Sequence, residues 1–143
     1  DRQTEALLDL EPDPRATVIQ ADLEDGSPWP LNEKFAGVVV VNYLHRPLTE
    51  NLLESLEPGG LLIYETFARG NENFSRPRNP DHLLKSGELL QMVLGRLQVI
   101  AYEHGIREKS PLPGVIQRIC AVNNLGQSVR EDREPQVLNL EPY

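Results

Sequence analysis

A run of four consecutive valines, residues 38–41, limits what this chain can fold into more than any other feature. A strand with one wet face alternates apolar and polar side chains, and this run does not alternate. We therefore expect residues 35–41 to form a strand covered on both faces, as in a parallel sheet between layers of helices. Ligands of such sheets bind at the carboxyl ends of the strands, so residues 42–45 are the first place to look for chemistry.

The segments around the valine run predict alternating strands and helices. Pro47 favours the start of a helix because its φ angle is already helical. Leucines at helical spacing give that helix one apolar face: Leu48, Leu52, Leu53 and Leu56. Pro58-Gly59-Gly60 is expected to stop the helix, and residues 61–64 predict a second buried strand. Upstream of the valines, residues 17–21 predict a β-strand and residues 22–26 an acidic turn.

The carboxyl-terminal half predicts one more helix and two strands. Apolar residues at helical spacing follow Asp81 and Ser86, either of which is expected to cap the helix, and Gly95 is expected to end it. Residues 97–106 and 115–122 predict strands. Only about eight residues separate them, too few for a crossover helix, so we expect an antiparallel hairpin.

Strands that alternate with helices and end in an antiparallel pair predict the α/β class. We expect an open sheet that is mostly parallel and carries an antiparallel C-terminal hairpin. A chain of 143 residues is long enough for one domain. Because the sequence loses its pattern near the end, we expect a domain over residues 1–123 and a tail over residues 124–143.

Composition argues against several classes of function. The formal net charge of −8 disfavours general nucleic-acid binding, which needs clustered Lys and Arg. No apolar run approaches the ~20 residues of a membrane span, and no signal peptide opens the chain, so we expect a cytoplasmic protein. The single cysteine, Cys120, is expected to be buried and inert. The histidines and Cys120 are scattered over unrelated elements, so we expect no metal site.

Two motifs resemble a known family. Pro58-Gly59-Gly60-Leu61-Leu62-Ile63, with the order of elements around it, resembles the carboxyl-terminal two-thirds of class I S-adenosylmethionine-dependent methyltransferases. Glu65-Thr66-Phe67 and Arg76-Pro77-Arg78-Asn79-Pro80 resemble a bacterial subgroup labelled tellurite-resistance or generic methyltransferases. The resemblance implies S-adenosylmethionine as cofactor. It also implies a partial Rossmann-like sheet, in which the reversed last strand lies between the fifth and sixth.

The family's glycine-rich turn, which wraps the methionine part of the cofactor, is missing here. The sequence holds no Gly-x-Gly-x-Gly, and the chain begins at the acidic residue that ends the family's second strand. We therefore expect a truncated domain that is inactive or that obtains the missing third from a partner.

The resemblance implies cofactor contacts ahead of the valine strand. Asp1 matches a carboxylate that accepts hydrogen bonds from both ribose hydroxyls. Asp22 matches a carboxylate that accepts from the adenine amino group, and the Leu23 N–H matches a donor to a ring nitrogen. Glu24 and Asp25 crowd the same turn, so a solvated acidic turn is the alternative.

At the end of the valine strand, the resemblance places the transferred methyl group and its acceptor. Asn42 is expected to hydrogen-bond the cofactor or the substrate, and Tyr43 to line the methyl channel. His45 is expected to remove a proton from the acceptor, since an imidazole can accept one near neutral pH. Alternatively, a histidine before Arg46 and Pro47 at a helix start is a surface capping residue.

The polar segment over residues 68–80 predicts a long loop after the second strand. Arg76 and Arg78 are candidates to bind a carboxylate or oxyanion substrate through bidentate hydrogen bonds. A solvated basic loop is the alternative. Glu65, at the strand end, is expected to contact the substrate or to pair with a nearby arginine.

The favoured function is S-adenosylmethionine-dependent methyl transfer to a small-molecule acceptor, with no membrane or general nucleic-acid partner. The first alternative is a non-catalytic remnant that acts as an interaction or dimerisation module. An exposed edge of the valine strand would invite pairing with a second copy, giving a homo-oligomer. A nicotinamide oxidoreductase is disfavoured, because the reversed hairpin and Pro58-Gly59-Gly60 are not expected in that class.

Overall fold

Three stretches of the chain are described in the computed structural model: residues 14–108, 113–127 and 130–139. The chain divides into two units, Asp1–Asn32 and Glu33–Tyr143, which we treat separately. In the first unit, the described residues form turns and irregular backbone. The predicted strand over residues 17–21 is therefore wrong. A strand needs a neighbour for its backbone hydrogen bonds, and the described sheet pairs no strand with these residues.

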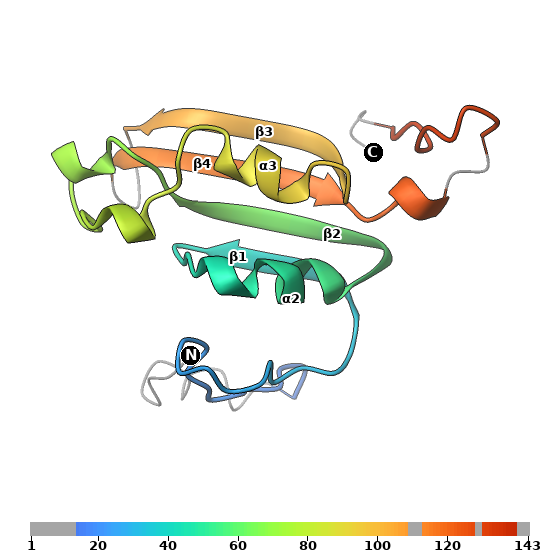
Figure 1. Cartoon of the computed structure of the whole chain (residues 1–143), viewed down its shortest axis with the longest axis horizontal. Helices are drawn as coiled ribbons and strands as arrows, with labels where there is room; N and C mark the ends of the chain where they lie inside the picture. The colour runs from blue at the N-terminus through green and yellow to red at the C-terminus, as the bar shows by residue number, and fades with distance from the viewer. Residues whose placement is uncertain (1–13, 109–112, 128–129, 140–143) are drawn as a thin grey trace. The chain divides into compact units, whose positions relative to one another are not determined.

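The second unit is built on a four-stranded sheet with one reversed strand. Its strands are β1 (Phe35–Val41), β2 (Leu56–Phe67), β3 (Gln98–Arg107) and β4 (Gly114–Val122). They lie in the order β1-β2-β4-β3, with β1 parallel to β2 and β4 antiparallel to both its neighbours (Figure 1). The predicted α/β class, the partial Rossmann-like sheet and the antiparallel C-terminal hairpin are confirmed.

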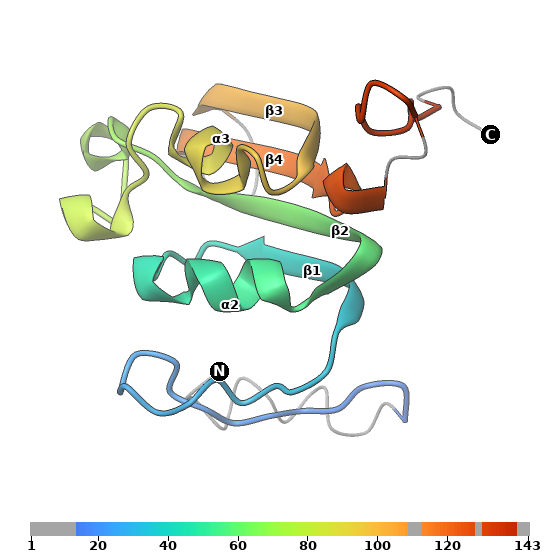
Figure 2. The same cartoon turned by 45° about the vertical axis from the view of Figure 1, so that its right-hand side comes forward.

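Two short helices cover one face of this sheet. They are α2 (Thr49–Glu54), which follows the 3-10 turn η1 (Arg46–Leu48), and α3 (Glu88–Val93). Figures 1 and 2 both show α2 and α3 on the same side of the strands. Leu53 of α2, Leu89 of α3 and Tyr64 of β2 belong to one buried hydrophobic cluster. This cluster fixes the helices on the sheet and forms the core of the unit.

The end of α2 differs from the sequence prediction. The helix stops at Glu54, and Pro58-Gly59-Gly60 lies inside β2, where the pairing with β1 is irregular. The Phe35 N–H donates to the Ser55 carbonyl oxygen at 2.8 Å. Pairing with β1 therefore begins directly after the helix, before the glycines are reached.

The start of α3 also differs from the prediction. The residue at its N-cap is Gly87, in the left-handed conformation with φ 71°, and neither Asp81 nor Ser86 caps the helix. Gly95 follows the helix with φ 72°, the left-handed conformation in which glycine commonly ends a helix. This agrees with its predicted role in ending α3.

The valine strand is covered on one face only in the described chain. Val40 is 8% exposed, whereas Val39 is 66% and Val41 is 55% exposed. Among the described strands β1 pairs with β2 alone, so it is an edge strand. The prediction of a central strand covered on both faces is wrong here. An apolar run shows that both faces of a strand can be buried. It does not determine whether other elements of the chain cover both faces.

A close approach between two backbones requires glycine at position 60. The Asn123 N–H donates to the Gly60 carbonyl oxygen at 2.9 Å, and its Nδ2 donates to the carbonyl oxygens of Leu56 and Glu57 at 3.2 and 3.1 Å. A Cβ at Gly60 would lie 2.9 Å from the carbonyl oxygens of Glu57 and Phe35. These backbone atoms cannot rotate away as a flexible side chain can.

Gly60→Ala is therefore expected to lower the free energy of unfolding by about 1–3 kcal/mol, the usual range for an overpacked site. Gly105→Ala is the matched control, because Gly105 also lies in a strand and its Cβ would meet nothing within 4 Å. The control should change stability by less than about 1 kcal/mol. Urea denaturation measures both variants, and equal losses would contradict the prediction.

Candidate functional site

The carboxyl ends of β1 and β2 meet at one edge of the sheet. Val41 pairs with Glu65, and the Asn42 N–H donates to the Glu65 carbonyl oxygen at 2.9 Å. Asn42 has φ 54°, in the left-handed region that asparagine tolerates better than most residues, and it is exposed. The structure thus brings Asn42 and Glu65 together, as the rule about strand ends leads one to expect.

Tyr43 and His45 lie on a short segment that is anchored to the core. The Tyr64 hydroxyl donates to the Tyr43 carbonyl oxygen at 2.9 Å. Burial raises the pKa of Tyr64 to about 12, so this hydroxyl stays a donor at neutral pH. Leu44 is 7% exposed and holds the segment between the two site residues. His45 is half-buried at the N-cap position of η1, as the capping alternative predicts, but its side chain makes no capping hydrogen bond.

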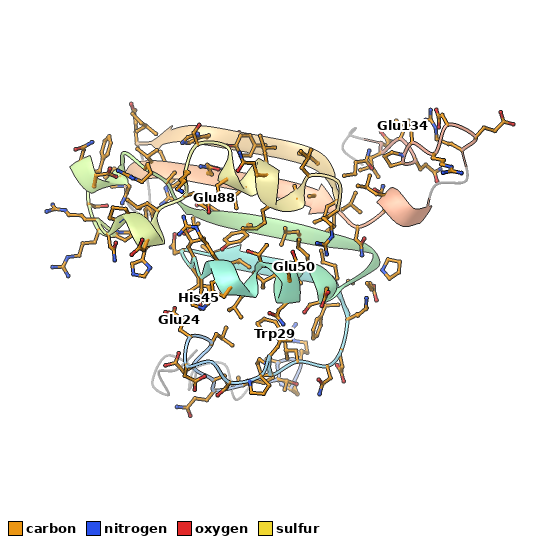
Figure 3. All side chains as sticks on the ribbon, viewed as in Figure 1. Glu24, Trp29, His45, Glu50, Glu88 and Glu134 are labelled. Carbon is orange, nitrogen blue, oxygen red and sulfur yellow. The ribbon has the colours of Figure 1, made fainter. Side chains whose placement is uncertain are left out.

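The next residue, Arg46, joins this segment to α3. Its Nε and Nη2 donate to the two carboxylate oxygens of Glu88 at 2.6 and 3.0 Å. Nη1 and Nη2 also donate to the carbonyl oxygens of Asp81 and Leu83, at 2.7 and 3.1 Å. Figure 3 marks the two ends of this connection with the labels Glu88 and His45, the residue before Arg46. Sequence reasoning missed this pair, because 42 residues separate its members and no spacing rule connects them.

Glu65 is held by two arginines that the sequence did not indicate. Arg107 Nη1 lies 2.5 Å from Glu65 Oε1, and Arg118 Nε lies 3.3 Å from Glu65 Oε2. Arg118 stands opposite Glu65 in the strand register and also binds Glu103 at 3.0 Å. The Arg107 and Glu65 side chains are 15% and 20% exposed, so this pair is largely shielded from water, whereas Arg118 is 47% exposed. The alternative in which Glu65 pairs with an arginine is confirmed, and its contact with a substrate stays a prediction.

The polar loop after β2 is organised by one buried asparagine. Asn71 is fully buried, its Nδ2 donates to the Pro77 carbonyl oxygen at 3.0 Å, and its Oδ1 accepts from the Val115 N–H at 3.3 Å. Arg76 and Arg78 are exposed on this loop. Neither guanidinium forms a hydrogen bond or ion pair with any residue that the structure describes, including those after β1. Their proposed role therefore stays a prediction.

The predicted adenine-binding residues lie in the first unit. Asp22 Oδ1 accepts from the Glu24 N–H at 3.0 Å, so the acidic turn is confirmed and one carboxylate oxygen takes part in it. Leu23 is half-buried. Asp1 lies outside the described residues. The cofactor contacts assigned to these residues stay predictions.

Neither a metal-ligand cluster nor a membrane-spanning helix is present in the described part of the chain. Within it, no three side chains of His, Cys, Asp or Glu are grouped as metal ligands. Its helices are too short or too polar to cross a bilayer. Cys120 is partly exposed, so the prediction of a buried thiol is wrong.

The lowered pKa of Glu88 predicts a stability difference that depends on pH. Burial raises this pKa, but hydrogen bonds from Arg46 and from the Lys85 N–H outweigh burial and bring it below 4.5. Such a carboxyl stabilises the fold above its unfolded pKa, and this contribution disappears as pH falls through the folded value. Glu88→Gln is expected to cost about 1 kcal/mol at neutral pH, and the difference should shrink below about pH 4.

Urea titrations of the wild type and the variant at about pH 7 and about pH 3.5 measure this difference. Glu50→Gln is the matched control, because Glu50 also pairs with an arginine, Arg96, at 2.8 Å but is 64% exposed. The control should stay within about 0.5 kcal/mol of the wild type. A cost of Glu88→Gln that persists unchanged in acid would refute the assignment.

Several solved structures resemble this fold, whereas no protein-family model and no curated protein matches the sequence. TehB from Haemophilus influenzae aligns with a TM-score of 0.53 at 13% identity, over 65% of this chain and 37% of TehB. The N-methyltransferase NodS from Bradyrhizobium japonicum WM9 aligns with a TM-score of 0.50 at 15% identity, over 67% of this chain and 55% of NodS. A SAM-dependent methyltransferase from Methanosarcina mazei aligns with a TM-score of 0.47 at 14% identity, over 65% of this chain and 62% of that one.

The chain therefore spans little more than a third of TehB and about half of NodS. At such low identity, the likeness concerns the fold. The reversed β4 between β2 and β3 is the strand arrangement that the sequence resemblance implied. This chain has, over the part aligned, the fold of class I S-adenosylmethionine-dependent methyltransferases.

Proposed function

We propose that this chain takes part in S-adenosylmethionine-dependent methyl transfer to a small-molecule acceptor. One observation carries the proposal. Asn42, Tyr43 and His45 follow directly after β1, at the carboxyl edge of a sheet with this fold. Ligands of open α/β sheets bind at that edge, which supports assigning these residues to the cofactor and its acceptor.

We assign Asn42 to a hydrogen bond with the cofactor or the substrate and, through the resemblance, Asp22 and Leu23 to the adenine ring. The amide of Asn42 can both donate and accept hydrogen bonds, and the residue is exposed. The Asp22 carboxylate suits an amino group, and Leu23 contributes a backbone N–H. Asp1 is assigned to the ribose hydroxyls through the resemblance alone. Because the sequence has no Gly-x-Gly-x-Gly, we assign no residue of this chain to the methionine end.

The residues around the acceptor have three tasks. When bound, S-adenosylmethionine supplies a methyl group that the positive sulfur has already activated, so the protein mainly aligns the acceptor and removes its proton. His45 accepts that proton, and Tyr43 lines the channel. Arg76 and Arg78 bind an anionic group of the acceptor, and Glu65 offers a carboxylate at the strand end.

Calorimetric titration with S-adenosylhomocysteine tests this proposal, with NADH as the comparison ligand. We expect binding of the first and none of the second. Asn42→Gly removes the amide while glycine keeps the left-handed backbone, so affinity should fall about fivefold to tenfold, the effect of one hydrogen bond. Asn73→Gly is the matched control on an exposed asparagine of the polar loop and should bind as the wild type does. Binding of NADH, or of neither ligand, would exclude the proposal.

Self-association through β1 is a second candidate function. Among the described strands, β1 pairs with β2 alone. On the uncovered face, Val39 and Val41 of β1 are 66% and 55% exposed, and Leu61 and Ile63 of β2 are 39% and 46% exposed. A strand edge without charges beside an apolar face is a template for pairing with another chain.

A second copy of this chain is the partner to which we commit. Antiparallel pairing of two copies of β1 around Val39 places Val39 opposite itself and Gly37 opposite Val41. Side chains of one face then stay on one face, because strand residues alternate with a period of two. A two-fold contact of this kind uses the same surface on both copies and needs no second complementary patch.

Val39→Lys is expected to convert a dimer to a monomer, because it places a charge at the centre of the contact. Leu94→Lys is the matched control, since Leu94 is 78% exposed and lies outside the strands. Light scattering at micromolar concentration measures the mass of each. Added salt should strengthen association by screening the repulsion between copies with net charge −8. A monomeric wild type, or a dimer that Val39→Lys leaves intact, would rule out this contact.

A further inference from the structure

Most of the N–H donors of Arg46 bind groups that flank residues 42–45, the segment that follows β1. A guanidinium carries five N–H donors. Arg46 makes two hydrogen bonds to the Glu88 carboxylate and one each to the carbonyl oxygens of Asp81 and Leu83. A charge-assisted bidentate pair fixes orientation as well as distance. The residue next to His45 is thereby fixed against one side-chain carboxylate and two backbone carbonyl groups.

Glu88 is itself held in place by the core. Its Oε2 accepts from the Lys85 N–H at 2.7 Å, and its side chain is 17% exposed. Gln117 of β4, which is fully buried, accepts from the Leu89 N–H at 3.3 Å and donates to the Lys85 carbonyl oxygen at 2.6 Å. Hydrogen bonds therefore run without a break from β4, through the start of α3, to Arg46.

His45 lies between two anchors of the same segment. Two residues before it, the Tyr43 carbonyl oxygen accepts from the Tyr64 hydroxyl at 2.9 Å. One residue after it, Arg46 binds Glu88. If the second anchor were lost, the next tie to the core after His45 would be α2, whose Leu53 is buried.

We infer that Arg46 is a positioning residue: its ion pair with Glu88 fixes His45, and its hydrogen bonds to Asp81 and Leu83 tie this segment to the residues directly after the polar loop. The inference rests on the proposed function, because positioning matters to the reaction only if His45 accepts the proton. Lysine cannot replace Arg46, since an ammonium group lacks the planar fork that binds a carboxylate at two points.

Nuclear magnetic resonance of the ligand-free chain with labelled histidine rings tests this inference. The chain has three histidines, His45, His82 and His104, which give separate ring signals. Arg46→Lys is expected to shift or broaden the His45 signal and to leave that of His104, on β3, unchanged.

Arg96→Lys is the matched control, because it changes the exposed ion pair with Glu50 and should leave the His45 signal unchanged. A His45 signal that does not respond to Arg46→Lys would overturn the inference. Equal changes at His45 and His104 would also overturn it, because they indicate a general loss of structure.

Hydrogen–deuterium exchange provides a second test that does not depend on the Arg46 variant. In Glu88→Gln, the amides of His45, Arg46 and Leu48 are expected to exchange about tenfold faster, as for loss of one charge-assisted hydrogen bond. The amides of β4 should keep their protection. A uniform rise in exchange, or no rise at residues 45–48, would overturn the inference.

Titration with S-adenosylhomocysteine separates this inference from the proposed function. If the His45 ring signal changes in Arg46→Lys but the wild type does not bind the ligand, the positioning role of Arg46 is supported and the proposal of methyl transfer is refuted. If the wild type binds the ligand but the His45 ring signal does not change in Arg46→Lys, the proposal of methyl transfer is supported and the positioning role of Arg46 is refuted.

Discussion

The register of β2 determines where the groups of the candidate site lie. This strand pairs with β1 on one side and with β4 on the other. It buries alternate residues at 1–2% exposure: Leu62, Tyr64 and Thr66. A slip by one residue would turn Glu65 into the core and Tyr64 out of it, at a high cost in free energy. The core therefore fixes the register, and the register sets Glu65 opposite Val41 on one side and Arg118 on the other.

Much of the sheet could be predicted from local sequence, because β1, β4 and the middle of β2 are apolar runs bounded by turn residues. The strand over residues 35–41 and the hairpin of β3 and β4 agree with the structure to within about one residue at each end. Tertiary contacts decided the rest. Pro58-Gly59-Gly60 was expected to end a helix, but a backbone contact with β1 and Asn123 makes it part of β2. The covering of the valine strand could not be predicted, since it depends on layers beyond the strand itself.

The candidate site was predictable only where it follows from strand ends. Asn42 and Glu65 come together because parallel neighbours end at the same edge. The pairs Arg46–Glu88 and Arg107–Glu65 each join residues 42 positions apart, and they depend on where α3 and β3 pack against the sheet. Charged residues are common in loops and strand ends, so nothing in the sequence separates these arginines from solvated ones.

Because the chain divides into two units, fluorescence and circular dichroism report on different parts of it. The protein contains one tryptophan, Trp29, which lies in the first unit, whereas Tyr43, Tyr64 and Tyr102 lie in the second. Indole emission therefore follows the surroundings of the first unit, while circular dichroism of the strands follows the second. Coincident melting of the two signals would mean one cooperative transition, and separate melting would mean two independent ones. A single tryptophan thus makes the cooperativity between the units measurable without labelling.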